Sequence, residues 1–240
     1  MWNNSLNLAI FNWLGQFTAV SPHFNQIAHY AAGSHLLKGF LVMGALWYFW
    51  FRDADPKSNT RRILIATLIG AVVAVAIARA TNNLGPYQPR PFANTALPYL
   101  AYAGLPERET QALFLWSSFP SDHATLFFAL ATGLFLISRR FGAFAFIYVL
   151  IVVALPRVYL GLHYPTDIIA GAVLGIGSVV LFTRPRVMNL YNRPYTTFKN
   201  KYPAAFQTAF FLVSAEISML FNDIRLLAEG IMKYLPGILT

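Results

Sequence analysis

Residues 116–128 read WSSFPSDHATLFF and place an acid and an imidazole, Asp122 and His123, at the start of an apolar run. Ionisable side chains are costly beside lipid, so those that border a membrane span are functional candidates by default. Ser121 comes just before the run and is a residue type that caps helix N-termini. The stretch therefore predicts a helix that follows Ser121 and carries polar groups at its first turn.

The composition is that of a membrane protein. Hydrophobic residues make up 57% of the 240-residue chain and charged residues only 11%, whereas a soluble domain carries about 25% charged residues. The net charge of +9 comes from basic residues at the ends of apolar runs. We attribute it to membrane topology and not to nucleic-acid binding. With no cysteine in the chain, disulfides and thiolate chemistry are excluded.

The apolar runs predict an all-α, polytopic transmembrane helix bundle of five to six spans. A bilayer core of about 30 Å needs about 20 apolar residues as helix. Five runs approach this length, some of them marginally: 27–51, 63–80, 124–137, 144–160 (interrupted by Pro156 and Arg157) and 167–182. A further apolar stretch, 206–228, contains charged residues. It is either a sixth span with a polar face or a helix lying on the membrane.

These runs suggest three parts. Residues 1–26 form an N-terminal interfacial segment, with a short amphipathic helix over 7–20. Residues 27–183 form the transmembrane core, and residues 184–240 form a C-terminal tail with the sixth or membrane-surface helix. The connection 81–120 is rich in Pro, Asn and Tyr, and long connections of this kind are usually functional.

Basic residues divide the loops between two sides. The loops at 52–62, at 138–141 and from 184 onward carry most of the arginines, so the positive-inside rule makes that side cytoplasmic. The 81–120 connection and the 160–166 turn then face outward. We expect a multi-pass protein of the plasma (inner) membrane whose active site faces the periplasm or exterior.

Three polar clusters fall on the outward side. QPRPF contains Arg90, FPSDHA contains the second cluster, and PRVYLGLHYPTD contains the third. Each has a simpler interpretation by itself: Arg90 can snorkel to headgroups, His123 can be an interfacial helix end, and His163 and Asp167 can be a structural pair. Arg157 lies inside an apolar run, where a charge is a functional suspect, and the convergence of all three clusters favours a site.

The residue types point to phosphate chemistry. Two arginines can bind phosphate through planar, bidentate donors, and backbone N–H groups at a helix start also face an anion. Of two histidines, one can attack phosphorus while the other protonates the leaving oxygen. Asp167 follows His163 by four residues and can fix the tautomer of that imidazole. We expect no metal and no cofactor.

The three clusters resemble the tripartite signature of the type 2 phosphatidic acid phosphatase superfamily. That signature is Lys, six residues, Arg-Pro; then Pro-Ser-Gly-His; then Ser-Arg, five residues, His, three residues, Asp. This chain matches it at Arg90-Pro91, at Pro120–His123, and from Arg157 through His163 to Asp167, and the resemblance spans about residues 60–183. It implies a histidine-phosphatase (haloperoxidase-like) core.

The resemblance also implies roles for the matching residues. His163 is the nucleophile that forms a phosphohistidine, His123 is the general acid for the leaving group, and Asp167 orients His163. The implied phosphate ligands include both motif arginines and Ser121.

This chain departs from the signature at three positions. Asn83 stands at the lysine position, and Arg79, one helical turn earlier, or Lys38 can compensate for the lost charge. Pro156 replaces the serine before Arg157. Asp122 replaces the glycine, as in the branch that includes bacterial undecaprenyl-diphosphate phosphatases, and either contacts His123 or acts as a helix-terminal charge. The candidate phosphate-binding residues are therefore Arg90, Arg157, Ser121, Asp122, Asn83 and Arg79.

We therefore predict a metal-independent lipid phosphate phosphatase. Its expected partners are the bilayer and a phospholipid or polyprenyl (di)phosphate substrate, of the undecaprenyl diphosphate or phosphatidate type, and no nucleic acid. Two alternatives stay open: a lipid phosphotransferase that uses the same site, and a non-catalytic lipid-binding or transport protein. The sequence predicts no oligomeric state.

Overall fold

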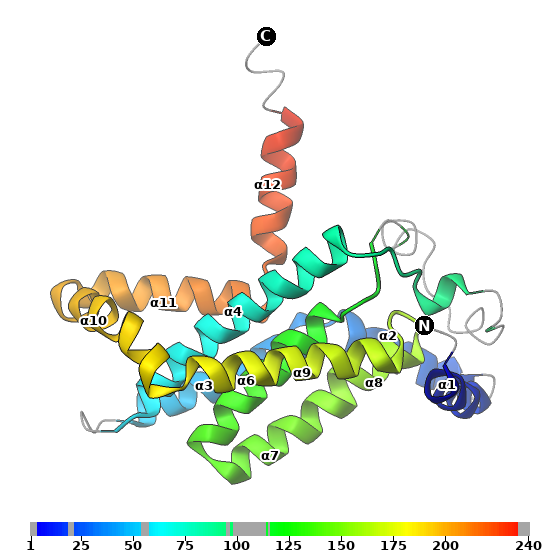
Figure 1. The fold of residues 1–240 in the computed structure, drawn as a ribbon, viewed down its shortest axis with the longest axis horizontal. Helices are drawn as coiled ribbons and strands as arrows, with labels where there is room; N and C mark the ends of the chain where they lie inside the picture. The colour runs from blue at the N-terminus through cyan, green and yellow to red at the C-terminus, as the bar shows by residue number, and fades with distance from the viewer. Residues whose placement is uncertain are drawn as a thin grey trace.

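The computed structural model describes residues 4–18, 22–53, 58–94, 97, 114 and 116–234, and all regular structure in this part of the chain is helical (Figure 1). The all-α prediction is confirmed. The elements are α1 Ser5–Thr18, α2 Pro22–Gly33, η1 Leu36–Phe40, α3 Leu41–Arg52, α4 Thr60–Leu84, η2 Pro91–Ala93, α6 Asp122–Ile137, α7 Arg139–Tyr148, η4 Val149–Ala154, α8 Leu155–Tyr159, α9 Pro165–Phe182, α10 Pro185–Lys201, α11 Pro203–Ser218 and α12 Asn222–Tyr234.

Helices α4, α6 and α9 pack against one another and form the centre of the bundle. The crossing of α6 and α9 depends on two glycines one turn apart on α9. A Cβ atom at Gly171 would lie 2.5 Å from the carbonyl oxygen of Ser121, and one at Gly175 would lie 2.1 Å from that of Thr125. Small residues at this spacing let two helix backbones touch. As a result, the first turns of α6 and α9 are held side by side.

Helix α4 also packs against this centre through a close glycine contact. A Cβ atom at Gly133 of α6 would meet Oγ1 of Thr67 at 2.2 Å, so α4 and α6 also approach through a glycine. The Ser178 hydroxyl of α9 donates a 2.8 Å hydrogen bond to the carbonyl oxygen of Gly70 on α4. The hydroxyl thus finds a partner inside an apolar interface, as buried polar groups require.

The predicted run 144–160 begins earlier than expected and is not interrupted at Pro156. A continuous helix runs from Arg139 to Tyr159 through α7, η4 and α8. The wide π-helical turn η4, Val149–Ala154, comes directly before Pro156. In a regular α-helix the proline ring would clash with the carbonyl four residues earlier, and a wider turn relieves such a clash. Arg157 therefore sits on a helix near its end.

In the part of the chain that the structure describes, three helices are long and apolar enough to cross a membrane: Thr60–Leu84, Arg139–Tyr159 and Pro165–Phe182. Helix α6 is apolar but shorter, and the predicted span 27–51 is divided among α2, the π-helical turn η1 and α3. The figure of five to six spans stays a prediction. Helix α1 confirms a helix over most of residues 7–20, while its place at an interface stays a prediction.

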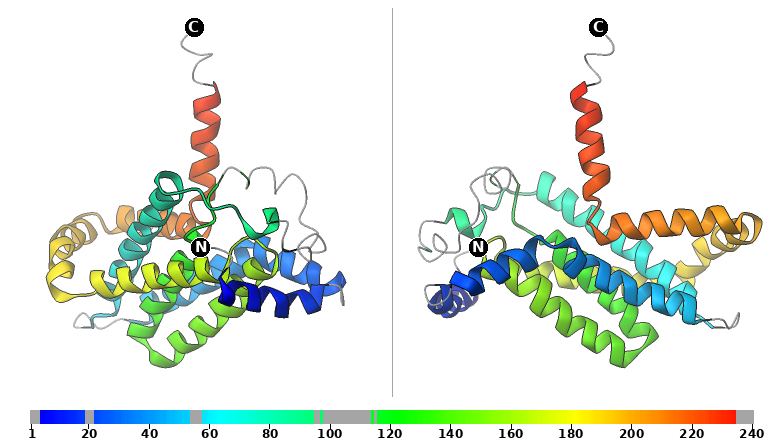
Figure 2. Two further views of the ribbon diagram at one scale, coloured as in Figure 1. Left: turned by 45° about the vertical axis from the view of Figure 1, so that its right-hand side comes forward. Right: turned by 180° about the vertical axis from the view of Figure 1, so that it is seen from behind.

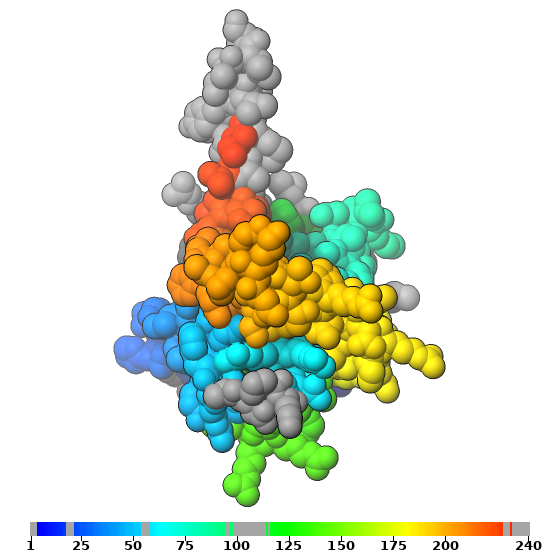
Figure 3. All heavy atoms as spheres, turned by 90° about the vertical axis from the view of Figure 1, so that its left-hand side faces the viewer, coloured from blue at the N-terminus to red at the C-terminus, as the bar shows by residue number. Residues whose placement is uncertain are grey.

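The bundle has two chemically different ends. Helices α4 and α7 begin, and α9 ends, beside arginines of the predicted cytoplasmic loops. This end, with α10, faces the viewer in Figure 3. The first turns of α6 and α9 and the last turn of α4 lie at the opposite end, on the right of Figure 1. All three polar clusters of the sequence therefore come from one end of the bundle.

The prediction of one helix over 206–228 is wrong. Two helices, α11 and α12, meet at Met219–Phe221, where Leu220 and Phe221 have left-handed φ angles of 57° and 58°. The amide of Phe221 donates a 2.7 Å hydrogen bond to the carbonyl of Glu216, which satisfies an orphan carbonyl at the end of α11 as helix-terminating motifs do. Helix α12 points away from the bundle in both views of Figure 2.

The close approach of α6 and α9 predicts a position-specific effect of added methyl groups. Gly175→Ala should destabilise the protein by about 1–3 kcal/mol, because the new Cβ overpacks against the α6 backbone. Thermal unfolding of the purified protein in detergent checks this. Gly177→Ala, on the same helix with nothing within 4 Å of its Cβ, is the matched control and should be neutral or slightly stabilising. Equal melting temperatures for the two variants would contradict the packing.

Candidate active site

A cavity of about 470 Å³ lies at the end of the bundle where the three clusters meet. Arg90, from the connection after α4, represents the first cluster, and Asp122 and His123 represent the second. Arg157 and His163 represent the third. The remaining lining residues are His35, Arg79, Trp116, Leu162, Met219, Leu220, Asn222 and Arg225. The structure therefore brings together residues that lie far apart in sequence, as predicted from topology.

His163 is buried in the turn between α8 and α9, and its tautomer is set by a backbone contact. Its Nδ1 lies 2.8 Å from the carbonyl oxygen of Ser118. Because a carbonyl can only accept, Nδ1 carries the proton and Nε2 carries the lone pair. That Nε2 is 3.4 Å from Nη1 of Arg90. Burial lowers the pKa of His163 from its usual 6.5, so the ring is neutral at neutral pH and Nε2 can act as a nucleophile.

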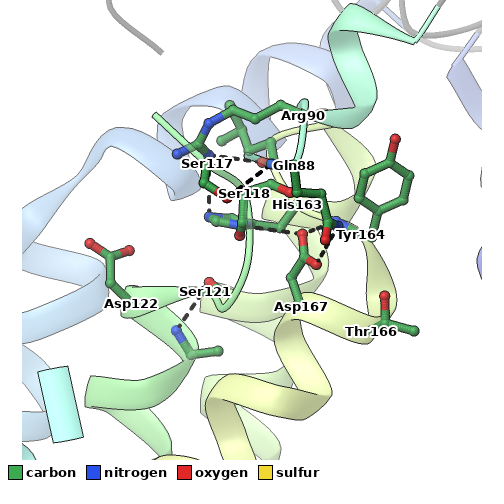
Figure 4. A network of polar contacts seen from close by, with 12 residues as sticks. Gln88, Arg90, Ser117, Ser118, Ser121, Asp122, His163, Tyr164, Thr166 and Asp167 are labelled. Carbon is green, nitrogen blue, oxygen red and sulfur yellow. Dashed lines mark hydrogen bonds and ion pairs between the residues drawn. The ribbon is translucent and has the colours of Figure 1, made fainter. Parts of the chain in front are cut away.

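Asp167 contacts His163 less directly than the sequence suggested. Its Oδ2 is 3.7 Å from Nδ1 of His163, longer than a hydrogen bond. Oδ2 accepts a 2.8 Å hydrogen bond from the backbone amide of Tyr164, and Oδ1 accepts one of 3.0 Å from the Gln88 side chain. Figure 4 shows these contacts around the His163 ring. The carboxylate thus caps α9 and places a negative charge beside an imidazole whose direct acceptor is Ser118.

Sequence reasoning missed Gln88 and Ser118. Ser118 acts through its backbone carbonyl, which leaves no signal in the residue type. Gln88 stands two residues before Arg90, and its backbone is tied to the second cluster: the amide of Ser118 donates a 2.9 Å hydrogen bond to the Gln88 carbonyl. The amide of Gln88 in turn donates to the Ser117 hydroxyl at 3.2 Å. A glutamine beside a motif arginine is the one available hint.

Asp122 and His123 form a second acid–imidazole pair at the start of α6. Oδ1 of Asp122 lies 2.8 Å from Nδ1 of His123 and also accepts a 2.8 Å hydrogen bond from the His123 backbone amide. Asp122 is also the first residue of α6, so its two predicted roles coexist. Its carboxylate would repel a phosphate, so contact with His123 explains it better than phosphate binding. The pairing leaves Nε2 of His123 for proton transfer.

The two motif arginines are buried and retain unused donors. Nη1 of Arg90 donates to the carbonyl of Leu162 at 2.9 Å, and Nη2 of Arg157 donates to that of Ala32 at 3.4 Å. The Nε atom of each arginine is buried with no hydrogen-bond partner in the described part of the chain. A buried cation without a carboxylate partner is costly. An oxyanion bound between the two guanidinium groups would offset that cost.

The remaining predicted phosphate ligands differ in whether they line the cavity. Arg79 lines the cavity, and its Nη2 donates a 2.7 Å hydrogen bond to the carbonyl of Leu220. Asn83, one turn further along α4, is exposed and lies outside the cavity lining. Lys38 is buried in η1, where Nζ donates to the carbonyl of Ala32, and does not line the cavity either. Of the charges considered for the missing motif lysine, the structure brings only Arg79 to the cavity.

Ser121 is the N-cap of α6, as its position in the sequence predicted. Its hydroxyl accepts a 3.4 Å hydrogen bond from the amide of Ala124 and caps α6, and its own amide donates to the carbonyl of Asp167 at 3.1 Å. The residue is fully buried outside the cavity lining. It therefore joins the first turns of α6 and α9.

The described residues include no cluster of three or more His, Asp or Glu side chains with the arrangement of a metal site. The acid–base groups are instead imidazoles paired with single acceptors. Arginines and histidines gathered in one cavity at the end of an apolar helical bundle are groups suited to phosphoryl transfer. Residues 85–191 match the family described as the PAP2 superfamily, and this match supports a lipid phosphatase. The resemblance seen in the sequence is confirmed.

The sequence similarity to known relatives extends beyond residues 85–191. The chain is 25% identical over 186 residues to the "Bacitracin transport permease protein BcrC" of Bacillus licheniformis, covering 77% of this chain and 83% of that protein. It is 27% identical over 173 residues to the "Putative undecaprenyl-diphosphatase YbjG" of Escherichia coli (strain K12), covering 72% and 78%. The apolar helices and these relatives indicate a membrane location.

The fold also matches a solved structure. The crystal structure of Aquifex aeolicus LpxE superposes with a TM-score of 0.52 at 24% identity, covering 76% of this chain and 97% of that one. At this identity the match supports the fold alone.

The Gln88–Asp167 contact predicts a positioning effect without a binding effect. Gln88→Ala should lower kcat for phosphate release by about 10-fold, because the carboxylate beside His163 loses a partner that orients it. KM should change by less than about twofold, since Gln88 does not line the cavity. Steady-state kinetics check both values. Gln207→Ala, an exposed position on α11, is the control, and a larger change in KM than in kcat would argue against a positioning role.

Proposed function

We propose that this protein is a metal-independent phosphatase that releases phosphate from a lipid phosphate or diphosphate through a phosphohistidine intermediate. The observation that carries the proposal is the state of His163. Its Nδ1 proton is donated to the carbonyl of Ser118 at 2.8 Å, which leaves Nε2 beside Arg90 in the cavity. A neutral imidazole whose unprotonated nitrogen lies beside a phosphate-binding arginine is an activated nucleophile.

In the first step, Nε2 of His163 attacks the terminal phosphorus, and the bond from that phosphorus to the leaving oxygen breaks. The leaving oxygen is the lipid alcohol oxygen of a monophosphate or the bridging oxygen of a diphosphate. The electron pair stays on that oxygen, which takes a proton from Nε2 of His123. Arg90 and Arg157 balance the charge that develops on the equatorial phosphoryl oxygens. Burial lowers the pKa of His123 well below 6.5. Asp122, 2.8 Å from Nδ1 of His123, and the bound phosphate oppose that shift and favour the protonated imidazole that this step requires.

In the second step, water attacks the phosphohistidine. His123 is now neutral and accepts a proton from the water, so the same residue acts as acid and then as base. The phosphorus–nitrogen bond breaks, inorganic phosphate leaves, and Nε2 of His163 regains its lone pair. Asp167 stabilises the positive charge that His163 carries while it is phosphorylated.

The proposed substrate is a polyprenyl diphosphate or a phosphatidate. Two observations support a lipid: the apolar helices around the site, and the name of the YbjG relative, a putative undecaprenyl-diphosphatase. The lipid tail would lie among the helices while the phosphate enters the cavity. Of these two classes, the name of the relative favours the polyprenyl diphosphate.

The two histidines should respond differently to the leaving group. His163→Ala should abolish phosphate release from every substrate, because the nucleophile is lost. His123→Ala should lower kcat by about 10²- to 10⁴-fold for a lipid alcohol leaving group. It should lower kcat far less for a p-nitrophenyl phosphate, since nitrophenolate leaves without a proton.

The measurement is phosphate release by purified protein in detergent, with and without EDTA, which should have no effect. His23→Ala, exposed on α2, is the control variant. Substantial activity of His163→Ala would reject the mechanism, and so would equal losses on both substrates for His123→Ala. Phosphate that appears on an added alcohol instead of in solution would identify a phosphotransferase.

We also propose that the site faces the periplasm or exterior, with the tail 184–240 starting on the cytoplasmic side. The chain has no cysteine, so single-cysteine variants report topology directly. Asn83→Cys and Asn59→Cys flank α4 at exposed positions. In intact cells a membrane-impermeant maleimide should label Asn83→Cys only, and both variants should react after permeabilisation. Labelling of Asn59→Cys alone in intact cells would invert the proposed orientation.

A further inference from the structure

Two arginines line the cavity in addition to the pair from the sequence motifs. Arg79 comes from α4 near its end, and Arg225 comes from the first turn of α12. Among the described residues that line the cavity, the only carboxylate is that of Asp122, which is paired with His123. The cavity therefore gathers more positive charge than its own acid can balance.

One phosphate does not account for this charge or this space. A phosphate monoester carries about −1.5 to −2 charge at pH 7, which Arg90 and Arg157 suffice to bind. The cavity, at about 470 Å³, falls in the range of pockets that hold whole small molecules. A second phosphate joined to the first would supply both the charge and the volume that the additional arginines face.

The turn between α11 and α12 fixes this second pair of arginines. Arg79 donates a 2.7 Å hydrogen bond to the carbonyl of Leu220 through one of the five N–H groups of its guanidinium. Leu220 and Phe221 both adopt the left-handed conformation, which is uncommon for non-glycine residues and clusters at functional sites. This turn brings the first residues of α12 to the cavity, although the helix then points away from the bundle (Figure 2).

Arg225 is held against the loop that leads into α6. Its guanidinium carbon lies 5.9 Å from the ring centroid of Trp116, a distance at which a cation and an aromatic face attract. Its Nη2 also donates to the side chain of Asn222 at 3.1 Å. Trp116 opens the stretch that ends in Asp122 and His123. The arginine of α12 is therefore placed relative to the proposed general acid.

We propose that Arg79 and Arg225 form a second phosphate subsite, specific for the lipid-linked phosphate of a lipid diphosphate. This inference rests on the proposed function, in which Arg90 and Arg157 hold the phosphate that His163 attacks. Nε2 of His163 forms a bond to the terminal phosphorus, and the bond from that phosphorus to the bridging oxygen breaks. The electron pair stays on the bridging oxygen, which takes a proton from His123 and leaves as part of the lipid monophosphate.

The subsite predicts a preference between two substrates with one tail. The purified full chain in detergent is assayed with a polyprenyl diphosphate and with the monophosphate of the same tail. The wild type should have a kcat/KM about 10-fold or more higher for the diphosphate. Arg79→Ala and Arg225→Ala should each lower kcat/KM for the diphosphate by about 10- to 100-fold, as expected for lost charge-assisted hydrogen bonds. Arg225→Ala should lower the value for the monophosphate by less than about threefold, because Arg225 belongs only to the second subsite.

Arg193→Ala is the matched control, since Arg193 is exposed on α10 and lies outside the cavity lining. It should leave both values unchanged. Thermal unfolding checks that each variant is folded. Of the two substitutions, Arg225→Ala should disturb the fold less, because Arg225 is exposed. Equal losses of kcat/KM on both substrates in the arginine variants, or no loss on the diphosphate, would overturn the second subsite. Phosphate release by the wild type in the same assay would still uphold the proposed function.

If the wild type released no phosphate from either lipid, the proposed function would fail, and binding would decide the subsite. In calorimetric titrations, inorganic pyrophosphate should bind the wild type more tightly than inorganic phosphate. The double variant Arg79→Ala/Arg225→Ala should lose that difference, while Arg193→Ala should keep it. Equal affinities in the wild type, or an undiminished difference in the double variant, would overturn the subsite independently of catalysis.

Discussion

The site depends on the contact between the first turns of α6 and α9. Gly171 lets the α9 backbone approach the carbonyl of Ser121, and the Ser121 amide donates to the carbonyl of Asp167 at 3.1 Å. This contact, together with the 2.8 Å hydrogen bond from His163 to the carbonyl of Ser118, fixes the position of His123 on α6 relative to His163 before α9. Catalytic groups must be held to within about half an ångström of the productive geometry. Packing between helices that carry almost no polar residues thus sets the geometry of a polar site.

Each histidine has its own acceptor at Nδ1, and the proposed mechanism gives the two rings different tasks. His163 donates to a neutral carbonyl, so its ring stays neutral and nucleophilic, with the charge of Asp167 3.7 Å away for the step in which it becomes phosphorylated. Burial lowers the pKa of His123 well below 6.5, and the carboxylate of Asp122, 2.8 Å from Nδ1, opposes that shift and favours the charged ring that a proton donor needs. In the proposed mechanism, the different acceptors at Nδ1 distinguish the nucleophile from the proton donor.

The sequence predicted the bundle and most of the site because its signals are local or topological. Apolar runs and the N-cap at Ser121 locate helices, and loop charges bring Arg90, His123 and His163 to one end. Three features escaped it. The acceptor for His163 is a backbone carbonyl, which no residue type reveals. The break at Leu220 and Phe221 occurs at large apolar residues, where the sequence pattern continues as a helix. The cavity contribution of Arg225 follows from that break and could not be foreseen without it.

The central claim is that His163 carries the phosphoryl group, and rapid-quench labelling tests it most directly. Purified protein is mixed with lipid substrate labelled at the terminal phosphate, quenched with base within one turnover, digested and mapped by mass spectrometry. The account predicts a base-stable, acid-labile phosphate on Nε2 of His163, formed and lost at rates that match turnover. A label on any other residue, or full turnover with no labelled protein in the first cycle, would contradict it.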